Sequence, residues 1–149
     1  MLGRVSGDAA LKARIERLLD RYDAFNAATG ERVLTHGDLG LHNIALEPQS
    51  GALAGIFDYD GAALADRHHD FRYLIFDTAT EGLLEGAIAA YEPLTGLRID
   101  REAVRLLNAA CAIGFLAFRD GHDADEPWCG RTLAEDLAWT DFAMSRVSV

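Results

Sequence analysis

Residues 36–43 read HGDLGLHN, and two short apolar segments follow them directly. These segments, residues 44–46 and 53–57, are joined by the turn PQSG (residues 48–51), whose proline and glycine favour a reversal of the chain. The pattern therefore predicts an antiparallel β-hairpin. Because a hairpin brings its two outer ends together, the polar loop before it should lie beside the sequence FDYDG (residues 57–61) that follows it.

Three oxygen-bearing side chains should converge at these ends of the hairpin. Asp38 and Asn43 belong to the loop before it, and Asp58 belongs to the loop after it. Two carboxylates and an amide oxygen are hard ligands that suit Mg²⁺ with bound phosphate rather than zinc. Phosphoryl transfer uses one carboxylate at the acceptor hydroxyl, and an amide with a second carboxylate to hold Mg²⁺ on the donor phosphates. An Asp five residues before an Asn, with another Asp one hairpin later, is typical of a kinase.

The same loop, together with residues 51–71 (GALAGIFDYDGAALADRHHDF), resembles the aminoglycoside phosphotransferase and choline kinase family, which has a protein-kinase-like fold. The resemblance is specific over residues 33–75. It implies a kinase that transfers the γ-phosphate of ATP or GTP to the hydroxyl of a small molecule, with Mg²⁺ as cofactor. An aminoglycoside-like or choline-like acceptor is the favoured substrate.

The resemblance also implies a role for each matched residue of the two loops. Asp38 and His36 are the catalytic candidates: Asp38 as the base or orienting carboxylate for the acceptor hydroxyl, and His36 as the residue that braces the loop. Asn43 and Asp58 are the candidates for binding Mg²⁺ and, with it, the nucleotide.

Acidic residues farther along the chain have supporting or substrate-binding roles in this interpretation. Asp70 is expected to accept hydrogen bonds from the backbone of the catalytic loop, and Asp66 to be a supporting or turn residue. The acidic segment 120–130 is either a solvated loop or a site for a cationic substrate. The second alternative names three candidates: Asp123, Asp125 and Glu126.

Outside the hairpin the sequence is mostly helical. Apolar residues spaced by three and four predict a helix over residues 8–28, followed by a short strand at 32–35. Everything after Asp66 has helical spacing, with Asp100 capping a long apolar helix and a last helix over about 131–144. The predicted fold class is therefore α+β and mostly helical, the C-terminal lobe of a protein-kinase-like fold with a small hairpin carrying the catalytic and metal loops.

The chain is expected to be a single domain, residues 1–149, without the nucleotide-binding lobe of the family. The residues before His36 are mainly one helix, and Lys12, the only lysine, lies within it rather than on a strand. No glycine-rich phosphate loop is present in the sequence. We therefore expect the isolated chain to be inactive or barely active. The alternative is a non-catalytic binding or regulatory module derived from such a kinase after loss of the nucleotide lobe.

Composition bounds the partners and the compartment. The formal net charge is −10, which disfavours nucleic acid and anionic lipid as partners and favours an amino-bearing, cationic acceptor, although solubility alone also explains it. No apolar run reaches the length of a membrane span, and the N-terminus has no apolar signal region. Two cysteines form no metal-binding pattern. These features predict a cytoplasmic protein without a membrane partner.

Overall fold

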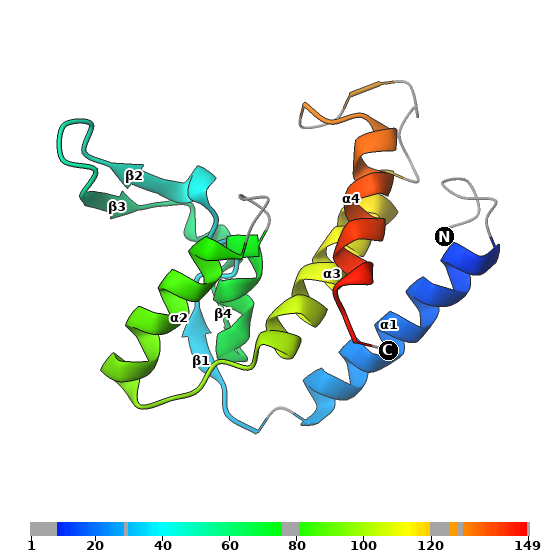
Figure 1. Ribbon diagram of the computed structural model, residues 1–149, viewed down its shortest axis with the longest axis horizontal. Helices are drawn as coiled ribbons and strands as arrows, with labels where there is room; N and C mark the ends of the chain where they lie inside the picture. The colour runs from blue at the N-terminus through cyan, green and yellow to red at the C-terminus, as the bar shows by residue number, and fades with distance from the viewer. Residues whose placement is uncertain (1–8, 29, 76–80, 120–125, 128–129, 149) are drawn as a thin grey trace. The chain divides into compact units, whose positions relative to one another are not determined.

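The computed structural model describes residues 9–28, 30–75, 81–119, 126–127 and 130–148 (Figure 1). Most of this chain is helical, in α1 (Ala9–Ala28), α2 (Gly82–Thr95), α3 (Arg101–Phe118) and α4 (Leu133–Ser145). The strands within these residues are β1 (Val33–Thr35), β2 (Ile44–Leu46), β3 (Leu53–Ile56) and β4 (Ala63–Ala65). The fold class is therefore α+β and mostly helical. None of the described helices is long and apolar enough to cross a membrane.

The predicted hairpin is confirmed as the antiparallel pair β2 and β3. Ile44 faces Ile56 across the pair, and the register is irregular between Ala45 and Leu46. One further hydrogen bond lies beyond the strands, from the backbone N–H of Phe57 to the carbonyl of Asn43, at 3.1 Å. This bond closes the open end of the hairpin, so the loop before β2 and the loop after β3 start from adjacent positions.

Strand β4 was not predicted from the sequence. It pairs antiparallel with β1, with Val33 opposite Ala65, and the Thr35 hydroxyl also donates to the Ala63 carbonyl at 3.0 Å. The segment is three residues long and contains two alanines, which have a low preference for strands. It becomes a strand because the turn of 3₁₀ helix at Tyr59–Gly61 leads the chain back to β1.

The segment after Asp66 differs from the α-helix that its apolar spacing predicts. Arg67–Ile75 is a 3₁₀ helix, and it buries Phe71, Leu74 and Ile75. These three side chains share a core with Leu84 and Ile88 of α2, with Ile99 just before α3, and with Val104 in its first turn. Asp66 favours the tight start because its carboxylate accepts a hydrogen bond from the backbone N–H of His68, at 2.9 Å.

The described chain divides into two compact units, and the boundary falls inside α3, between Val104 and Arg105. The unit Thr29–Val104 contains both sheets, the 3₁₀ segments and α2. The other unit contains α1, the rest of α3 and α4, around a core that includes Ile15, Leu106, Ile113, Leu116 and Met144. Each unit has its own core, and the single domain expected over residues 1–149 stays a prediction.

Caps fix the starts of the last two long helices. The carboxylate of Asp100 accepts from the backbone N–H of Glu102 at 2.9 Å, which confirms Asp100 as the cap of α3. Thr132 and Glu135 form a reciprocal capping box at the start of α4. The last helix thus begins at Leu133, two residues later than the sequence pattern predicts.

Candidate active site

Gly37 fixes the path of the loop that leaves β1. Its φ is +82°, a conformation that other residues rarely adopt. A Cβ atom built at Gly37 would lie 2.1 Å from the carbonyl oxygen of Gly61. The loop carrying Asp38 therefore packs backbone to backbone against the loop that follows Asp58. Only glycine meets both requirements, the left-handed conformation and the close approach.

Asp38 presents a carboxylate that is held at one oxygen. The amide nitrogen of Asn43 donates to Asp38 Oδ2 at 3.0 Å, and the side chain of Asp38 is 36% exposed. No described residue forms a hydrogen bond to Oδ1. The carboxylate is thus oriented through Oδ2 and can accept a hydrogen bond from a ligand at Oδ1.

His42 also contacts Asp38, and this contact was not predicted. Its Nε2 lies 3.3 Å from Asp38 Oδ2, where an N–H can donate to the carboxylate, and its ring meets the ring of Tyr73 edge-on. The only signal was its position four residues after Asp38, which brings two side chains together only when a helical turn separates them. The 3₁₀ turn Leu41–Asn43 supplies that turn.

Asn43 is buried, and both N–H groups of its side-chain amide form hydrogen bonds. The amide nitrogen donates to the Asp38 backbone carbonyl at 2.9 Å and also to the Asp38 carboxylate. Because the N–H groups are engaged, the amide oxygen is the remaining polar atom of this side chain, and it can act only as an acceptor or metal ligand.

Asp58 follows Phe57, whose backbone hydrogen bond to Asn43 closes the hairpin. Its backbone is left-handed, with φ and ψ both 64°, and no other non-glycine residue of the described chain has a positive φ. Such a conformation costs about 1–2 kcal/mol and is more frequent at functional sites. The structure joins Asp38 to Asn43 by hydrogen bonds. It shows no hydrogen bond between the carboxylate of Asp58 and either of these residues.

The oxygen atoms that the two loops offer are of the type that Mg²⁺ prefers. Within the described residues, no three His, Cys, Asp or Glu side chains are grouped so that they could hold a metal ion. The available ligands are instead the amide oxygen of Asn43 and the exposed carboxylate of Asp58. Mg²⁺ commonly takes one or two carboxylates from a protein and completes its shell with water and substrate phosphates.

His36 connects the two loops through both ring nitrogens. Nε2 lies 3.0 Å from the carbonyl of Phe57, to which it donates, and Nδ1 accepts from the backbone N–H of Asp38 at 3.3 Å. The ring also packs against the ring of Tyr59, with centroids 4.5 Å apart. A neutral imidazole protonated on Nε2 satisfies both hydrogen bonds and leaves neither nitrogen for proton transfer. These contacts favour the bracing role among those named for His36.

Asp70 and Arg72 hold the peptide groups at the start of the loop. Asp70 accepts from the backbone N–H of His36 at 3.0 Å and from that of Gly37 at 2.9 Å, one at each carboxylate oxygen. Arg72 donates to the carbonyl of Gly37. Gly37 is therefore bound on both its N–H and its C=O side by the same 3₁₀ helix. The family resemblance implied this supporting role for Asp70, whereas no sequence pattern pointed to Arg72.

The remaining acidic candidates lie elsewhere. Asp66 accepts from both the backbone N–H and the ring Nδ1 of His68, so its contacts stabilise the turn before the 3₁₀ helix. Asp123 and Asp125 lie outside the described residues, and Glu126 is exposed.

Replacing Asp70 with alanine should destabilise the fold. Two backbone N–H groups would lose their acceptor, and each such loss costs about 1–3 kcal/mol when water cannot replace it. Urea denaturation would measure the free energy of unfolding. Asp60→Ala removes an exposed carboxylate of the same region and should change it by less than about 0.5 kcal/mol. Equal stabilities of the two variants would contradict the support assigned to Asp70.

His69 should make the stability depend on pH. Burial lowers its pKa below the ordinary 6.5, and the positive charge of Arg72 lowers it further, against opposing effects of Asp66 and Asp70. The unfolded chain therefore binds a proton at His69 more readily than the folded chain. The stabilisation that neutral His69 contributes is fully present above about pH 6.5, and it is lost as the pH falls through the lower pKa of the folded state.

The test compares the wild type with His69→Gln, using urea denaturation between about pH 7.5 and 5. Glutamine has an oxygen that can replace Nδ1 as the acceptor for Arg72, which lies 2.7 Å away. The variant should lose less stability than the wild type as the pH falls. Arg32→Gln, at an exposed residue that does not titrate in this range, is the control and should follow the wild-type slope. A His69→Gln slope as steep as that of the wild type would mean that other groups cause the dependence.

Comparison with known proteins adds one match. A family model described as "Phosphotransferase enzyme family" matches residues 4–107. This range covers more than half of the chain and includes both loops, the hairpin and the 3₁₀ helix that carries Asp70. No match was found among the curated proteins.

Proposed function

Because the chain belongs to the phosphotransferase enzyme family, we propose that the site around Asp38 transfers the γ-phosphate of ATP or GTP to a hydroxyl group of a small molecule. The observation that carries this proposal is the state of the Asp38 carboxylate. Asn43 fixes one oxygen, and the other accepts no hydrogen bond from the described residues. A carboxylate that is oriented but still accessible is suited to accept the proton of an attacking hydroxyl.

The surrounding residues have distinct tasks in this mechanism. The acceptor hydroxyl would donate its hydrogen bond to Asp38 Oδ1 and lose its proton there as it attacks. Asn43 prevents the carboxylate from turning away. The amide oxygen of Asn43 and the carboxylate of Asp58 would hold Mg²⁺, which when bound neutralises charge on the donor phosphates. His36, Asp70 and Arg72 keep the loop in place through hydrogen bonds that do not involve the substrate.

The donor phosphates need binding groups that differ from Lys12. This lysine pairs with Glu16 one turn away on α1, at 3.9 Å, and both side chains are exposed. Positioning and charge stabilisation supply most of the rate of phosphoryl transfer. We therefore expect little turnover from the 149-residue chain assayed alone. The same residues should support turnover when a nucleotide-binding lobe is present.

The acceptor class is proposed from charge. The formal net charge of −10 favours an amino-bearing acceptor, such as an aminoglycoside-like or choline-like alcohol, over an anionic one. Asp58 and Asp60 are both exposed beside the Asp38 loop and add to the local negative charge.

The proposal is tested by direct detection of a phosphorylated acceptor. The product of the complete open reading frame and the 149-residue chain are each incubated with ATP or GTP, Mg²⁺ and a panel of aminoglycosides, choline-like alcohols and sugars. Mass spectrometry of the acceptors should show the addition of one phosphate, which EDTA abolishes. Binding of an acceptor without its phosphorylation, under every condition, would instead support a non-catalytic binding module.

A further inference from the structure

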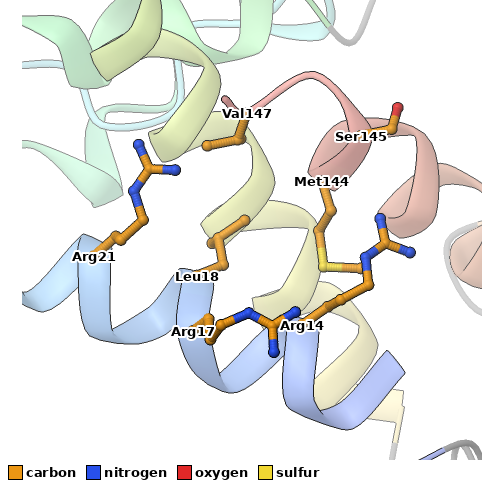
Figure 2. A pocket seen from close by; sticks show the side chains of 7 residues that line it. All are labelled: Arg14, Arg17, Leu18, Arg21, Met144, Ser145 and Val147. Carbon is orange, nitrogen blue, oxygen red and sulfur yellow. The ribbon is translucent and has the colours of Figure 1, made fainter. Parts of the chain in front are cut away.

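A small pocket lined by three arginines lies in the unit that contains α1 and α4 (Figure 2). Arg14, Arg17 and Arg21 project from α1, while Met144, Ser145 and Val147 come from the end of α4 and the residues after it. The pocket has a volume of about 120 Å³. It is independent of the phosphotransfer site, so the inference drawn from it goes beyond the proposed function and does not rest on it.

The three guanidinium groups differ in their hydrogen-bond partners. Arg14 donates to the carboxylate of Asp141 at 2.6 Å, and Arg21 donates to the backbone carbonyl of Ser148. Arg17 forms no hydrogen bond or ion pair with any residue that the structure describes. One of the three arginines therefore has its full set of donors available to a ligand.

The spacing of the arginines costs stability in the absence of a ligand. Arg17 follows Arg14 by three residues and precedes Arg21 by four, so all three share one face of α1. Like charges at these spacings repel each other and destabilise a helix. A bound anion would relieve that repulsion.

Charge and shape together define the ligand. The charged residues that line the pocket are three arginines, of which Arg14 pairs with Asp141, and a phosphate monoester carries about −1.5 to −2 at neutral pH. A guanidinium group binds phosphate oxygens in pairs, which a point charge cannot do. The other wall is apolar, because Leu18, Met144 and Val147 line it and belong to the core of this unit.

We propose that this pocket binds a small phosphate monoester with a compact apolar substituent. The phosphate group lies against Arg17 and its two arginine neighbours, and the substituent contacts Leu18, Met144 and Val147. The volume is below the roughly 150 Å³ of a cavity that holds one benzene ring, so the pocket itself has room only for a small ring or a short alkyl group, and the phosphate group would meet the exposed Arg17 at the surface.

Phenyl phosphate and inorganic phosphate are suitable probes, and isothermal titration calorimetry of the full chain without Mg²⁺ would measure their binding. We expect saturable binding of both, with phenyl phosphate the tighter ligand. Arg17→Gln should lower the affinity for phenyl phosphate by at least about tenfold, because a charge-assisted pair of hydrogen bonds is lost. Arg17→Lys keeps the charge but loses the paired geometry, and it should give an intermediate affinity.

Arg32→Gln is the matched control, because it makes the same change in charge at an exposed arginine outside the pocket. It should leave the affinity for phenyl phosphate unchanged. The melting temperature without ligand should be equal or higher in Arg17→Gln, which would show that the variant is folded. Absence of saturable binding to the wild type, or equal losses in Arg17→Gln and Arg32→Gln, would overturn the proposal. Tighter binding of inorganic phosphate than of phenyl phosphate would contradict the proposed contact between an apolar substituent and Leu18, Met144 and Val147.

Discussion

Asp38→Asn should lower kcat for phosphoryl transfer by about 10²- to 10⁴-fold, the usual contribution of a general base. Asparagine has the same shape as aspartate and retains an oxygen to accept from Asn43, so the loop should keep its conformation. The change removes the negative charge and the basicity at the oxygen that would receive the proton. The loss should therefore appear in kcat, with KM for the acceptor changed much less.

The measurement is steady-state turnover of the product of the complete open reading frame, with the acceptor that the panel identifies. Glu47→Gln makes the same carboxylate-to-amide change in the exposed turn of the hairpin and should retain wild-type turnover. Urea denaturation should give Asp38→Asn a stability within about 1 kcal/mol of the wild type. Retention of more than about a tenth of the wild-type kcat would exclude Asp38 as the general base.

Gly37→Ala should have the largest combined effect on stability and activity. The new Cβ would lie 2.1 Å from the carbonyl oxygen and 2.8 Å from the carbonyl carbon of Gly61, so one of the two loops must move. The left-handed backbone at φ +82° adds a conformational cost of about 1–2 kcal/mol. We expect a destabilisation of at least about 2 kcal/mol. Activity should fall by about 100-fold or more, because a displacement of about 1 Å at the reacting group is enough for such a loss.

Gly51→Ala separates the two causes. Gly51 also has a left-handed backbone, with φ +68°, but a Cβ atom there would meet nothing within 4 Å. This control has the conformational strain without the steric clash, and it lies in the hairpin turn away from Asp38. Differential scanning calorimetry and the turnover assay should show a mild loss of stability and near-normal activity for Gly51→Ala. If the two alanine variants behave alike, close packing of Gly37 on Gly61 is not important for the site.

The hairpin, the helices α1 and α3, and the proximity of the two loops follow from local sequence. The hairpin depends on two apolar segments and a turn between them, and α1 and α3 depend on apolar spacing and on caps such as Asp100. Because a hairpin brings its ends together, the order of Asp38, Asn43 and Asp58 along the chain was enough to predict adjacent loops. The hydrogen bond from Phe57 to Asn43 agrees with that reasoning.

The contacts that orient the loop could not be read from the sequence, because they join residues far apart in the chain or depend on an unusual turn. Arg72 reaches Gly37 across 35 positions, and β4 exists only through its pairing with β1. His42 contacts Asp38 because a 3₁₀ turn separates them, which neither residue specifies by itself.

The sequence alone determined which residues can perform chemistry and in what order they occur, because residue types and short-range turns are local properties. The way in which Asp38 is held depends on contacts between segments that are distant in the chain. The place of its loop depends on the packing of Gly37 against Gly61, on the hydrogen bond that Asp70 accepts from the Gly37 N–H, and on the one that Arg72 donates to the Gly37 carbonyl. These interactions form only when the 3₁₀ helix and both loops have reached their places, since hydrogen bonds and close contacts between distant segments have no counterpart in local sequence preference.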